Sequence, residues 1–306
     1  MAGSQETLLA QLDTLISEGR NPATMHIDEG TSLDIVRMIN REDHHVAPAI
    51  EKILPEIAEA VDRIVDGLSR EGRLFYIGAG TSGRLGILDA VECRPTFSVN
   101  DTLVNGIIAG GERAITHAVE GAEDDEVQGQ KDLDAHAITR NDVVVGLSAS
   151  GRTPYVCGAL RRASDHGCTT IGIACTPESP VLTLSDIALC PVVGPEALTG
   201  STRMKSGTAQ KLILNMLSTA SMIRLGKTYQ NLMVDVNASN EKLRARAIRI
   251  VMQATGCEIS IAKQALSEAG QKTKVAIVMI LCNVEATIAS EMLQNSNGFL
   301  RQATKE

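Results

Sequence analysis

The strongest constraint in the sequence is an alternation, between about residues 73 and 225, of short apolar runs with longer amphipathic stretches. Each apolar run has the length of a buried strand, and each amphipathic stretch is long enough for a helix. Such alternation predicts right-handed β-α-β crossovers and an α/β fold with a doubly wound, mostly parallel sheet. The predicted strands are 74–77, 104–109, 143–147, 169–174 and 187–193, and the predicted helices between and after them are 82–91, 112–119, 154–164 and 202–225.

Helical patterns flank this region on both sides. Residues 5–70 carry apolar side chains at helical spacing, and Pro55 is expected either to begin a new helix or to kink an old one. The first of these apolar side chains are Leu8, Leu9, Leu12, Leu15 and Ile16. Strand signals stop after Gly226, and the predicted helices there are 240–256, 259–270 and 273–293. We therefore expect an N-terminal helical segment over 1–56, the α/β domain over 57–235 and a small helical C-terminal domain over 240–306.

Charge and composition restrict the class of ligand. The 306 residues include 29 Lys and Arg against 37 Asp and Glu, a net charge of −8 that opposes non-specific attraction to nucleic acid or anionic lipid. With no Trp, three Tyr and three Phe, the chain has little material for stacking bases. We expect no nucleic-acid partner and no membrane partner, and an anionic ligand should be small and held by a local site.

The sequence also bears on location and metal content. The longest apolar run, 275–282, is too short to cross a bilayer, which takes about 20 residues as a helix, and the first residues lack the pattern of a secretory signal. The seven cysteines form no CxxC motif, and the six histidines form no metal-binding pair. We therefore expect a cytoplasmic protein with reduced cysteines and no bound metal.

One motif occurs twice. The sequence GAGTSGR at 78–84 recurs as GLSASGR at 146–152, and each copy follows a predicted strand and opens a helix. Backbone N–H groups at a helix start attract an anion, glycine allows close approach, and hydroxyls add donors, so two such loops can hold one phosphate. The candidate phosphate-binding residues are Gly80, Thr81, Ser82 and Gly83 in the first loop and Ser148, Ser150, Gly151 and Thr153 in the second.

Two other interpretations of these loops remain open from the residues alone. Both could be ordinary strand-to-helix turns, which every parallel sheet needs. The first copy also matches GxGxxG, the dinucleotide fingerprint, but the acidic residue that should contact the ribose comes later than expected, at Glu112. A serine hydrolase is not supported, because GxSxG is absent from the strand-to-helix junctions.

A third segment, GSTRMKSGT at 200–208, lies between the last predicted strand and a long helix. Ser201, Arg203 and Lys205 combine a hydroxyl with two cations that can pair with phosphate or carboxylate oxygens. The alternative is a helix start whose charges are simply solvated.

Acidic residues that could move protons cluster in two places. Asp89 and Glu92 lie near the end of the first crossover helix, and Glu120 and Glu123 lie on either side of Gly121 after the second predicted strand. One carboxylate can take a proton next to a carbonyl while a second carboxyl protonates a leaving oxygen. From the sequence alone, helix-capping or solvated carboxylates are the stronger interpretation of any single one.

Three motifs together resemble a known family. YIGAGTSGRLG at 76–86, SASGRTPY at 148–155 and LTGSTRMK at 198–205 are similar to the N-acetylmuramic acid 6-phosphate etherases of bacteria, which have the sugar isomerase (SIS) fold. The resemblance covers nearly the whole chain. It implies a lyase that cleaves the D-lactyl ether of this sugar phosphate by eliminating lactate and adding water, during cell-wall sugar recycling, with no cofactor.

The resemblance also assigns residues. The two functional glutamates of the family correspond to Glu92, in DAVEC at 89–93, and to Glu123, in EGAED at 120–124, with the roles of acid and base left open between them. Arg203 and Lys205 become candidates for the lactyl carboxylate. Val91 and Arg94 beside Glu92 depart from the pattern of some relatives, which have a smaller residue and a proline there.

Helix geometry constrains Glu92. If the helix that opens at Ser82 continues to Glu92, ten residues at ~1.5 Å each separate the carboxylate from the first loop by about 15 Å, more than the sugar spans. We therefore expect either a break in the helix or a Glu92 that acts on the sugar held by a partner subunit. Because SIS relatives form dimers with sites at the interface, the resemblance implies a homodimer.

Two alternative functions share this fold. An aldose-ketose isomerase would act on the same C2 proton but keep the ether oxygen. A non-enzymatic regulator that senses phosphosugars, as glucokinase regulatory proteins do, would need neither glutamate. The modest length of the chain and the presence of both glutamates count against the regulator, and release of lactate would separate the etherase from the isomerase.

Overall fold

The computed structural model describes residues 19–236 and 241–305, so the predicted helical positions Leu8, Leu9, Leu12, Leu15 and Ile16 lie outside the described residues. The described chain divides into two compact units. The first, here called the sheet unit, contains the chain up to Ala90 together with Thr102–Leu217. The second, the helical unit, contains Val91–Asp101 together with the chain from Ser218 onward.

The sheet unit is built on five parallel strands in the order β2-β1-β3-β4-β5. The predicted α/β fold with a doubly wound parallel sheet is therefore confirmed. β1 and β3 are buried along their whole length, as expected for strands covered on both faces. The strands are β1 (Leu74–Gly78), β2 (Val104–Ile108), β3 (Val143–Leu147), β4 (Thr169–Ile173) and β5 (Ile187–Leu189).

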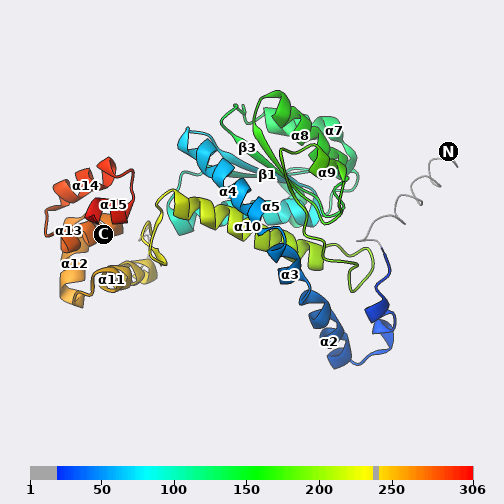
Figure 1. Ribbon diagram of the computed structural model, residues 1–306, viewed down its shortest axis with the longest axis horizontal. Helices are drawn as coiled ribbons and strands as arrows, with labels where there is room; N and C mark the ends of the chain where they lie inside the picture. Colours follow the sequence, from blue (N-terminus) through cyan, green and yellow to red (C-terminus); the bar gives the residue numbers. More distant parts are fainter. Residues whose placement is uncertain (1–18, 237–240, 306) are drawn as a thin grey trace. The chain divides into compact units, whose positions relative to one another are not determined.

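Helices cover both faces of this sheet (Figure 1). Phe75 and Ile77 of β1 share an apolar core with Tyr155 and Leu160 of α8 (Pro154–Asp165), which also packs on α7 (Glu126–Asp134). On the other face lie α4 (Leu54–Ser69) and α5 (Gly80–Phe97). The remaining helices that begin in this unit are η2 (Pro22–Thr24), η3 (Ile27–Glu29), α2 (Ser32–Asp43), α3 (Val46–Glu51), α6 (Arg113–Thr116), η4 (Ala122–Asp124), α9 (Pro180–Thr183) and α10 (Lys205–Arg224).

Pro55 occupies the first turn of α4, so it begins a new helix, one of the two outcomes expected from the sequence.

The predicted helix over 112–119 is wrong in extent. Only α6 forms there, and the chain then turns at Gly121, whose φ of +74° ends any helix, before η4 and the unpredicted α7.

The helical unit has its own core, in which Ile250, Val251, Leu266, Val278 and Leu293 are buried together. A two-stranded hairpin, which the sequence analysis missed, precedes its helices. The elements are β6 (Thr228–Tyr229), β7 (Leu232–Met233), α11 (Glu241–Thr255), α12 (Ile259–Glu268), α13 (Thr273–Cys282), α14 (Ala286–Asn295) and α15 (Leu300–Thr304).

The single helix predicted over 273–293 is wrong, because the chain bends by 103° between α13 and α14. Asn283 ends α13 in the left-handed conformation, with φ of +53°. Within the described ranges no individual helix has the length and apolar character to cross a membrane; α13 and α14 satisfy that test only jointly, across their bend.

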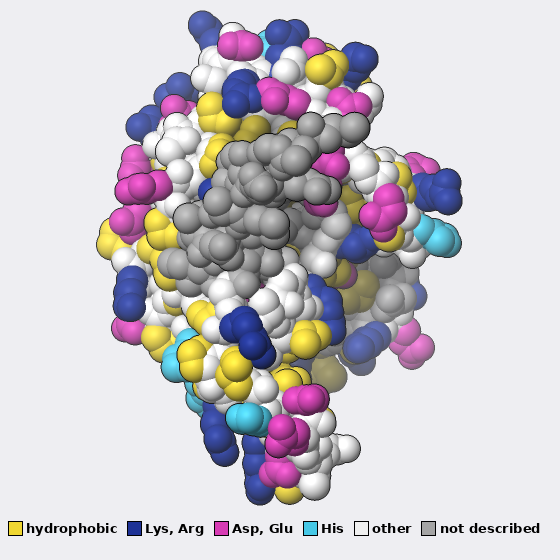
Figure 2. All heavy atoms as spheres, turned by 90° about the vertical axis from the view of Figure 1, so that its right-hand side faces the viewer, with side chains coloured by type: hydrophobic (Ala, Val, Ile, Leu, Met, Phe, Trp, Pro, Cys, Tyr) yellow, Lys and Arg dark blue, Asp and Glu magenta, His cyan; other side chains and the backbone are white. Residues whose placement is uncertain are grey.

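The face shown in Figure 2 carries Lys and Arg side chains interspersed with Asp and Glu side chains. This mixed pattern accords with the net charge of −8.

A buried ion pair fixes the amino ends of β1 and β3. Asp142, whose side chain is only 1% exposed, accepts hydrogen bonds from the backbone N–H of Arg73 (2.7 Å), the Arg73 guanidinium (2.8 Å) and the backbone N–H of Thr139 (2.7 Å). Burial alone would raise the pKa of Asp142, but these hydrogen bonds and the Arg73 charge outweigh it and hold that pKa below its usual value.

A second buried pair holds the start of α10. Lys205 Nζ lies 2.6 Å from Glu42 Oε2, and the two side chains are 2% and 9% exposed. Glu196, fully buried, accepts hydrogen bonds from the backbone N–H groups of Lys205 (2.8 Å) and Ser206 (2.9 Å) and so caps the helix. Burial alone would raise the pKa of Glu42. The hydrogen bonds from Lys205 and Asn21 and the Lys205 charge outweigh this effect and hold that pKa below its usual value.

We predict that Asp142→Asn lowers the free energy of unfolding at pH 7 by about 2–3 kcal/mol, because a buried charged acceptor is lost. Since the folded pKa of Asp142 is depressed, its stabilising contribution is complete above about pH 4 and is lost as pH falls through the folded pKa. Denaturant unfolding of both proteins between pH 7 and pH 2.5 measures this. Asp66→Asn, which removes an exposed partner of Arg70, should cost less than about 1 kcal/mol, and an equal loss in both variants would contradict the prediction.

We predict that Lys205→Met costs roughly 3–5 kcal/mol of unfolding free energy, because it leaves the Glu42 carboxylate buried without its cation. Adding Glu42→Gln should recover part of this loss. A double-mutant cycle measured by chemical denaturation gives the coupling energy, and additive effects of the two substitutions would show that the pair contributes no coupling.

Candidate active site

The strand order creates a topological switch point between β1 and β3. The chain leaves β1 for β2 on one side and later returns to build β3, β4 and β5 on the other. In open parallel sheets, ligands bind beyond the carboxyl ends of the strands at such a point. Gly78 pairs with Leu147 in the register of β1 and β3, so the two copies of the repeated motif leave the sheet at the same level. The structure therefore brings the two predicted loops together.

The second loop, which follows β3, gathers three hydroxyl groups. Ser148 Oγ lies 2.8 Å from Thr153 Oγ1 and 3.4 Å from Ser150 Oγ. The backbone N–H of Gly151 donates to Ser148 Oγ at 2.9 Å. Thr153 is the N-cap of α8, so these hydroxyls lie at the start of a 12-residue helix, where an anion is favoured.

Gly151 is required for this loop to close. Its φ is +70°, and a Cβ there would collide with the side-chain hydroxyl of Ser179. Ser179 Oγ is itself buried with no hydrogen-bond partner among the described residues. Sequence analysis missed Ser179, because nothing in the local pattern signals that it packs against the second loop.

The first loop, which follows β1, opens α5. Ser82 is 8% exposed, and its hydroxyl donates to Gln210 Oε1 at 2.9 Å. Gly80 has φ of +52° and is exposed, while Thr81 is half-buried. At Gly83 a Cβ would approach Ile108 Cγ1 to 2.6 Å, so glycine there lets α5 pack closely on the sheet.

Gln210 of α10 is a second residue that sequence analysis missed. It is fully buried, and its Nε2 has no hydrogen-bond partner among the described residues. Its only signal was a polar residue in a largely apolar stretch of α10, which by itself does not indicate a site. By accepting this hydrogen bond, Gln210 holds the Ser82 side chain of the first loop in one orientation.

A cavity of about 170 Å³ adjoins the first loop. Its lining includes Ala79 and Gly80 from that loop, Arg84 from α5, and the segment 118–123, which contains Glu123. Arg84 holds this segment in place, because its guanidinium donates to backbone carbonyls just before it, those of Ile115 (3.1 Å) and His117 (3.2 Å). The exposed carboxylate of Glu123 thus shares one cavity with a predicted phosphate loop.

Glu92 lies on α5, in the part of this helix that belongs to the helical unit. Its side chain is exposed. α5 runs without interruption from Gly80 through Glu92 to Phe97, so the helix break that was one of the two expected arrangements is absent.

Asp89, the other acidic candidate on α5, is buried and hydrogen-bonded. It accepts from the Tyr76 hydroxyl at 3.1 Å and from Lys211 Nζ at 2.9 Å. These contacts tie α5 to β1 and α10, which is a structural role.

The third predicted segment, 200–208, separates into exposed and buried parts. Arg203 is exposed and Ser201 is half-buried. The Lys205 ammonium, in contrast, is engaged by Glu42. The sequence analysis missed this pairing because Glu42 is far away in the chain.

Burial also disfavours the thiolate, which is the nucleophilic form of cysteine, at two positions. Burial raises the pKa of the Cys175 thiol to about 12 and that of Cys168 to about 11, which keeps both protonated near neutral pH. Over residues 19–236 and 241–305, no three His, Cys, Asp or Glu side chains are grouped so that they could hold a metal ion.

Comparison with known proteins identifies the family. A model of the SIS domain matches residues 119–220, and a model of the glucokinase regulatory protein N-terminal SIS domain matches residues 56–164. Among solved structures, a phosphoheptose isomerase from Francisella tularensis aligns with 63% of this chain and 100% of its own, at 19% identity and a TM-score of 0.49.

Two curated relatives are far more similar. The N-acetylmuramic acid 6-phosphate etherase of Brucella anthropi is 57% identical over 300 residues, 98% of each chain. That of Vibrio campbellii is 58% identical over 302 residues, 99% of this chain and 98% of its own. Identity at this level over nearly the full length of both chains means that this chain is a member of the N-acetylmuramic acid 6-phosphate etherase family, with the SIS fold.

Proposed function

We propose that this chain cleaves the D-lactyl ether of N-acetylmuramic acid 6-phosphate, releasing D-lactate and N-acetylglucosamine 6-phosphate. The observation that carries the proposal is the cavity shared by the first loop and Glu123, which joins an anion-binding element to a carboxylate. The names of the curated relatives supply the substrate.

The phosphate of the substrate is held by the two loops. In this proposal Ser82, Ser148, Ser150 and Thr153 supply hydroxyls, and Gly80, Thr81, Gly83 and Gly151 shape the two loops around the phosphate. Two helix starts, of α5 and α8, add favourable dipoles for a dianion. The short distances between the hydroxyls of the second loop support this assignment.

The chemistry follows from the open form of the sugar. The C1 aldehyde makes the proton on C2 acidic enough for a carboxylate base to remove. The C3–O bond then breaks while a second carboxyl protonates the departing lactate oxygen, leaving a C2=C3 double bond conjugated with the aldehyde. Water adds back, with hydroxyl to C3 and a proton to C2. Glu92 and Glu123 are the two carboxyls that we assign to these roles, in either order, and no step needs a metal or an organic cofactor.

We assign Glu92 to the site of a partner subunit. α5 is continuous between Ser82 and Glu92, so about 15 Å of helix lies between the first loop and this carboxylate in one chain. An exposed Glu92 is available to a second copy. The functional form in this proposal is a homodimer.

The lactyl carboxylate is held by Arg203 with the help of Ser201. Arg203 is exposed, and a guanidinium can pair with both oxygens of a carboxylate. Lys205 supports this segment from a buried position by holding the start of α10, rather than by contacting the substrate.

We place this reaction in the cytoplasm, as a step in the recycling of cell-wall sugars. We also propose a functional division into a helical segment over 1–56, a phosphosugar-binding domain over 57–235 and a helical domain over 240–306; it differs from the compact units, which group Val91–Asp101 and the chain from Ser218 with the helical unit.

We predict that Glu123→Gln lowers kcat by about 10³-fold or more, because it removes a proton-transfer group, while the affinity for N-acetylglucosamine 6-phosphate is unchanged. The measurement is enzymatic detection of D-lactate released from N-acetylmuramic acid 6-phosphate. Glu120→Gln changes a glutamate that lines the same cavity and serves as the matched control, expected within a few-fold of wild type. Wild-type protein that converts the sugar phosphate without releasing lactate would favour an isomerase and remove the proposal.

We predict that inactive Glu92→Gln chains recover activity when mixed with inactive chains carrying Ser82→Ala and Ser150→Ala. If each site uses the loops of one chain and Glu92 of the other, random pairing restores about a quarter of wild-type activity. D-lactate release after the two proteins are unfolded and refolded together measures this. Activity at the level of the separate variants would show that Glu92 acts within its own chain.

A further inference from the structure

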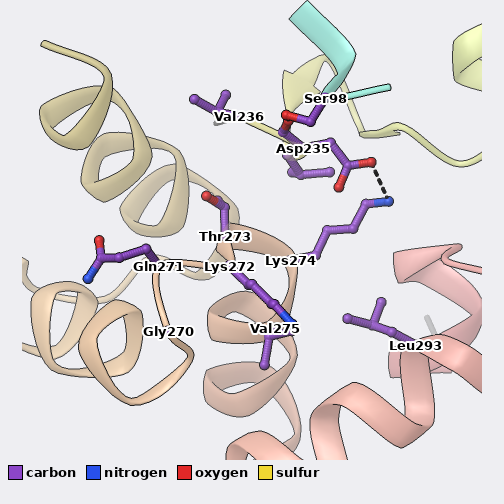
Figure 3. Close-up of a pocket in the computed structure, with 11 residues that line it drawn as sticks. Ser98, Asp235, Val236, Gly270, Gln271, Lys272, Thr273, Lys274, Val275 and Leu293 are labelled. Carbon is purple, nitrogen blue, oxygen red and sulfur yellow. Dashed lines mark hydrogen bonds and ion pairs between the residues drawn. The ribbon is translucent and has the colours of Figure 1, made fainter. Parts of the chain in front are cut away.

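Irregular segments of this chain are held to their neighbours by a few side-chain contacts. Asp235, in the segment after β7, pairs with Lys274 Nζ at 2.8 Å and with Lys227 Nζ at 3.4 Å, and Figure 3 shows the first of these pairs. Residues 110–124, between β2 and α7, form a longer segment that is interrupted only by the short helices α6 and η4. They include Glu123, and we call them the Glu123 segment.

The Glu123 segment has little packing to fix its position. Among its residues, all of which the structure describes, only Ala114 is buried, and Val119 and Ala122 are half-buried. Two alanines and a valine bury little apolar area, so the hydrophobic effect holds this segment only weakly. Hydrogen bonds from side chains of neighbouring elements therefore matter more here than they do in the core.

Those hydrogen bonds come from one residue. Over the described ranges, Arg84 is the only side chain outside the Glu123 segment that hydrogen-bonds to it. Its Nε donates to the carbonyl of Ile115 at 3.1 Å, and its Nη2 donates to the carbonyl of His117 at 3.2 Å. Both carbonyls lie at the end of α6, where a helix leaves carbonyl groups without partners of its own. Two donors of one planar guanidinium therefore hold the end of α6.

Arg84 also connects this segment to the first loop. It is the last residue of the GAGTSGR motif and lies near the start of α5, directly after Gly83. Gly80, Arg84 and Glu123 all line the cavity beside the first loop. The guanidinium therefore links the loop that we assign to the phosphate with the segment that carries a proposed proton-transfer group.

We propose that Arg84 is a positioning residue for the reaction. It holds the Glu123 segment so that the Glu123 carboxylate faces the sugar bound by the first loop, and it acts through this segment rather than by touching the substrate. The inference rests on the proposed role of Glu123. Because a reacting group displaced by about 1 Å can cost about 100-fold in rate, loss of Arg84 should affect turnover far more than binding.

The test compares kcat for D-lactate release with the affinity for N-acetylglucosamine 6-phosphate, measured by isothermal titration calorimetry. Arg84→Ala should lower kcat by about 100-fold and leave the affinity at the wild-type value, because both loops are intact. Arg84→Lys keeps the charge but offers a point donor that cannot bridge both carbonyls, so its kcat should remain about tenfold below that of wild type.

Two comparisons separate positioning from a general structural role. Arg113→Ala is the matched control and should be as active as wild type, since Arg113 is an exposed arginine of the same segment whose side chain makes no hydrogen bond or ion pair with the described residues. In a chain that already carries Glu123→Gln, adding Arg84→Ala should cause little further loss of kcat, because both changes remove the same contribution. The Arg84 variants should melt close to the wild-type temperature, because the hydrogen bonds that they lose are exposed to water.

The proposal is overturned if Arg84→Ala or Arg84→Lys keeps the wild-type kcat. It is also overturned if Arg84→Ala lowers kcat by the same factor in the Glu123→Gln chain as in the wild-type chain. Failure of the proposed function would look different, because the wild type would then release no D-lactate or the Glu123→Gln variant would remain fully active.

Discussion

The arrangement of the candidate active site depends on the parallel pairing of β1 with β3. Asp142 controls that pairing at the amino ends of the two strands, because its carboxylate precedes β3 and accepts hydrogen bonds from Arg73, which precedes β1. Five residues later both strands end together, and each passes directly into a copy of the same glycine- and serine-rich loop. A shift of one residue in this register would separate the two loops and turn the side chains of β1 to the wrong face.

Much of this fold was predictable from the sequence, because strands buried on both faces stand out as short apolar runs. All five predicted strands are present in the described chain, and α8 and α11 begin within a residue of their predicted starts. The errors arise where the hydrophobic pattern carries no information. The uniformly apolar run before Asn283 gave no signal for the bend there, and a hairpin as short as β6 and β7 lies below the length that a periodic pattern can reveal.

The candidate site was predictable to the extent that its residues are local in sequence. The two loops, each a continuous motif, come together as the topology requires. Contacts between distant segments were not predictable. Gln210 meets Ser82, and Glu42 meets Lys205, only because of how α2, α5 and α10 are placed in three dimensions. Lys205 shows the consequence most clearly, since a cation in a promising motif proves to have a buried carboxylate as its partner.

The division of the chain has a further consequence for how it can be dissected. The helical unit is not a simple C-terminal attachment, because it also includes Val91–Asp101, an excursion from the middle of the sheet unit that carries Glu92. The polypeptide passes between the units three times, twice within a helix, α5 and α10. Cys93 and Phe97 are both buried and belong to the helical unit. A chain truncated after Leu217 would keep these two residues but lose the rest of the unit in which they pack. Neither unit is therefore expected to be transplanted or expressed alone as an autonomous module.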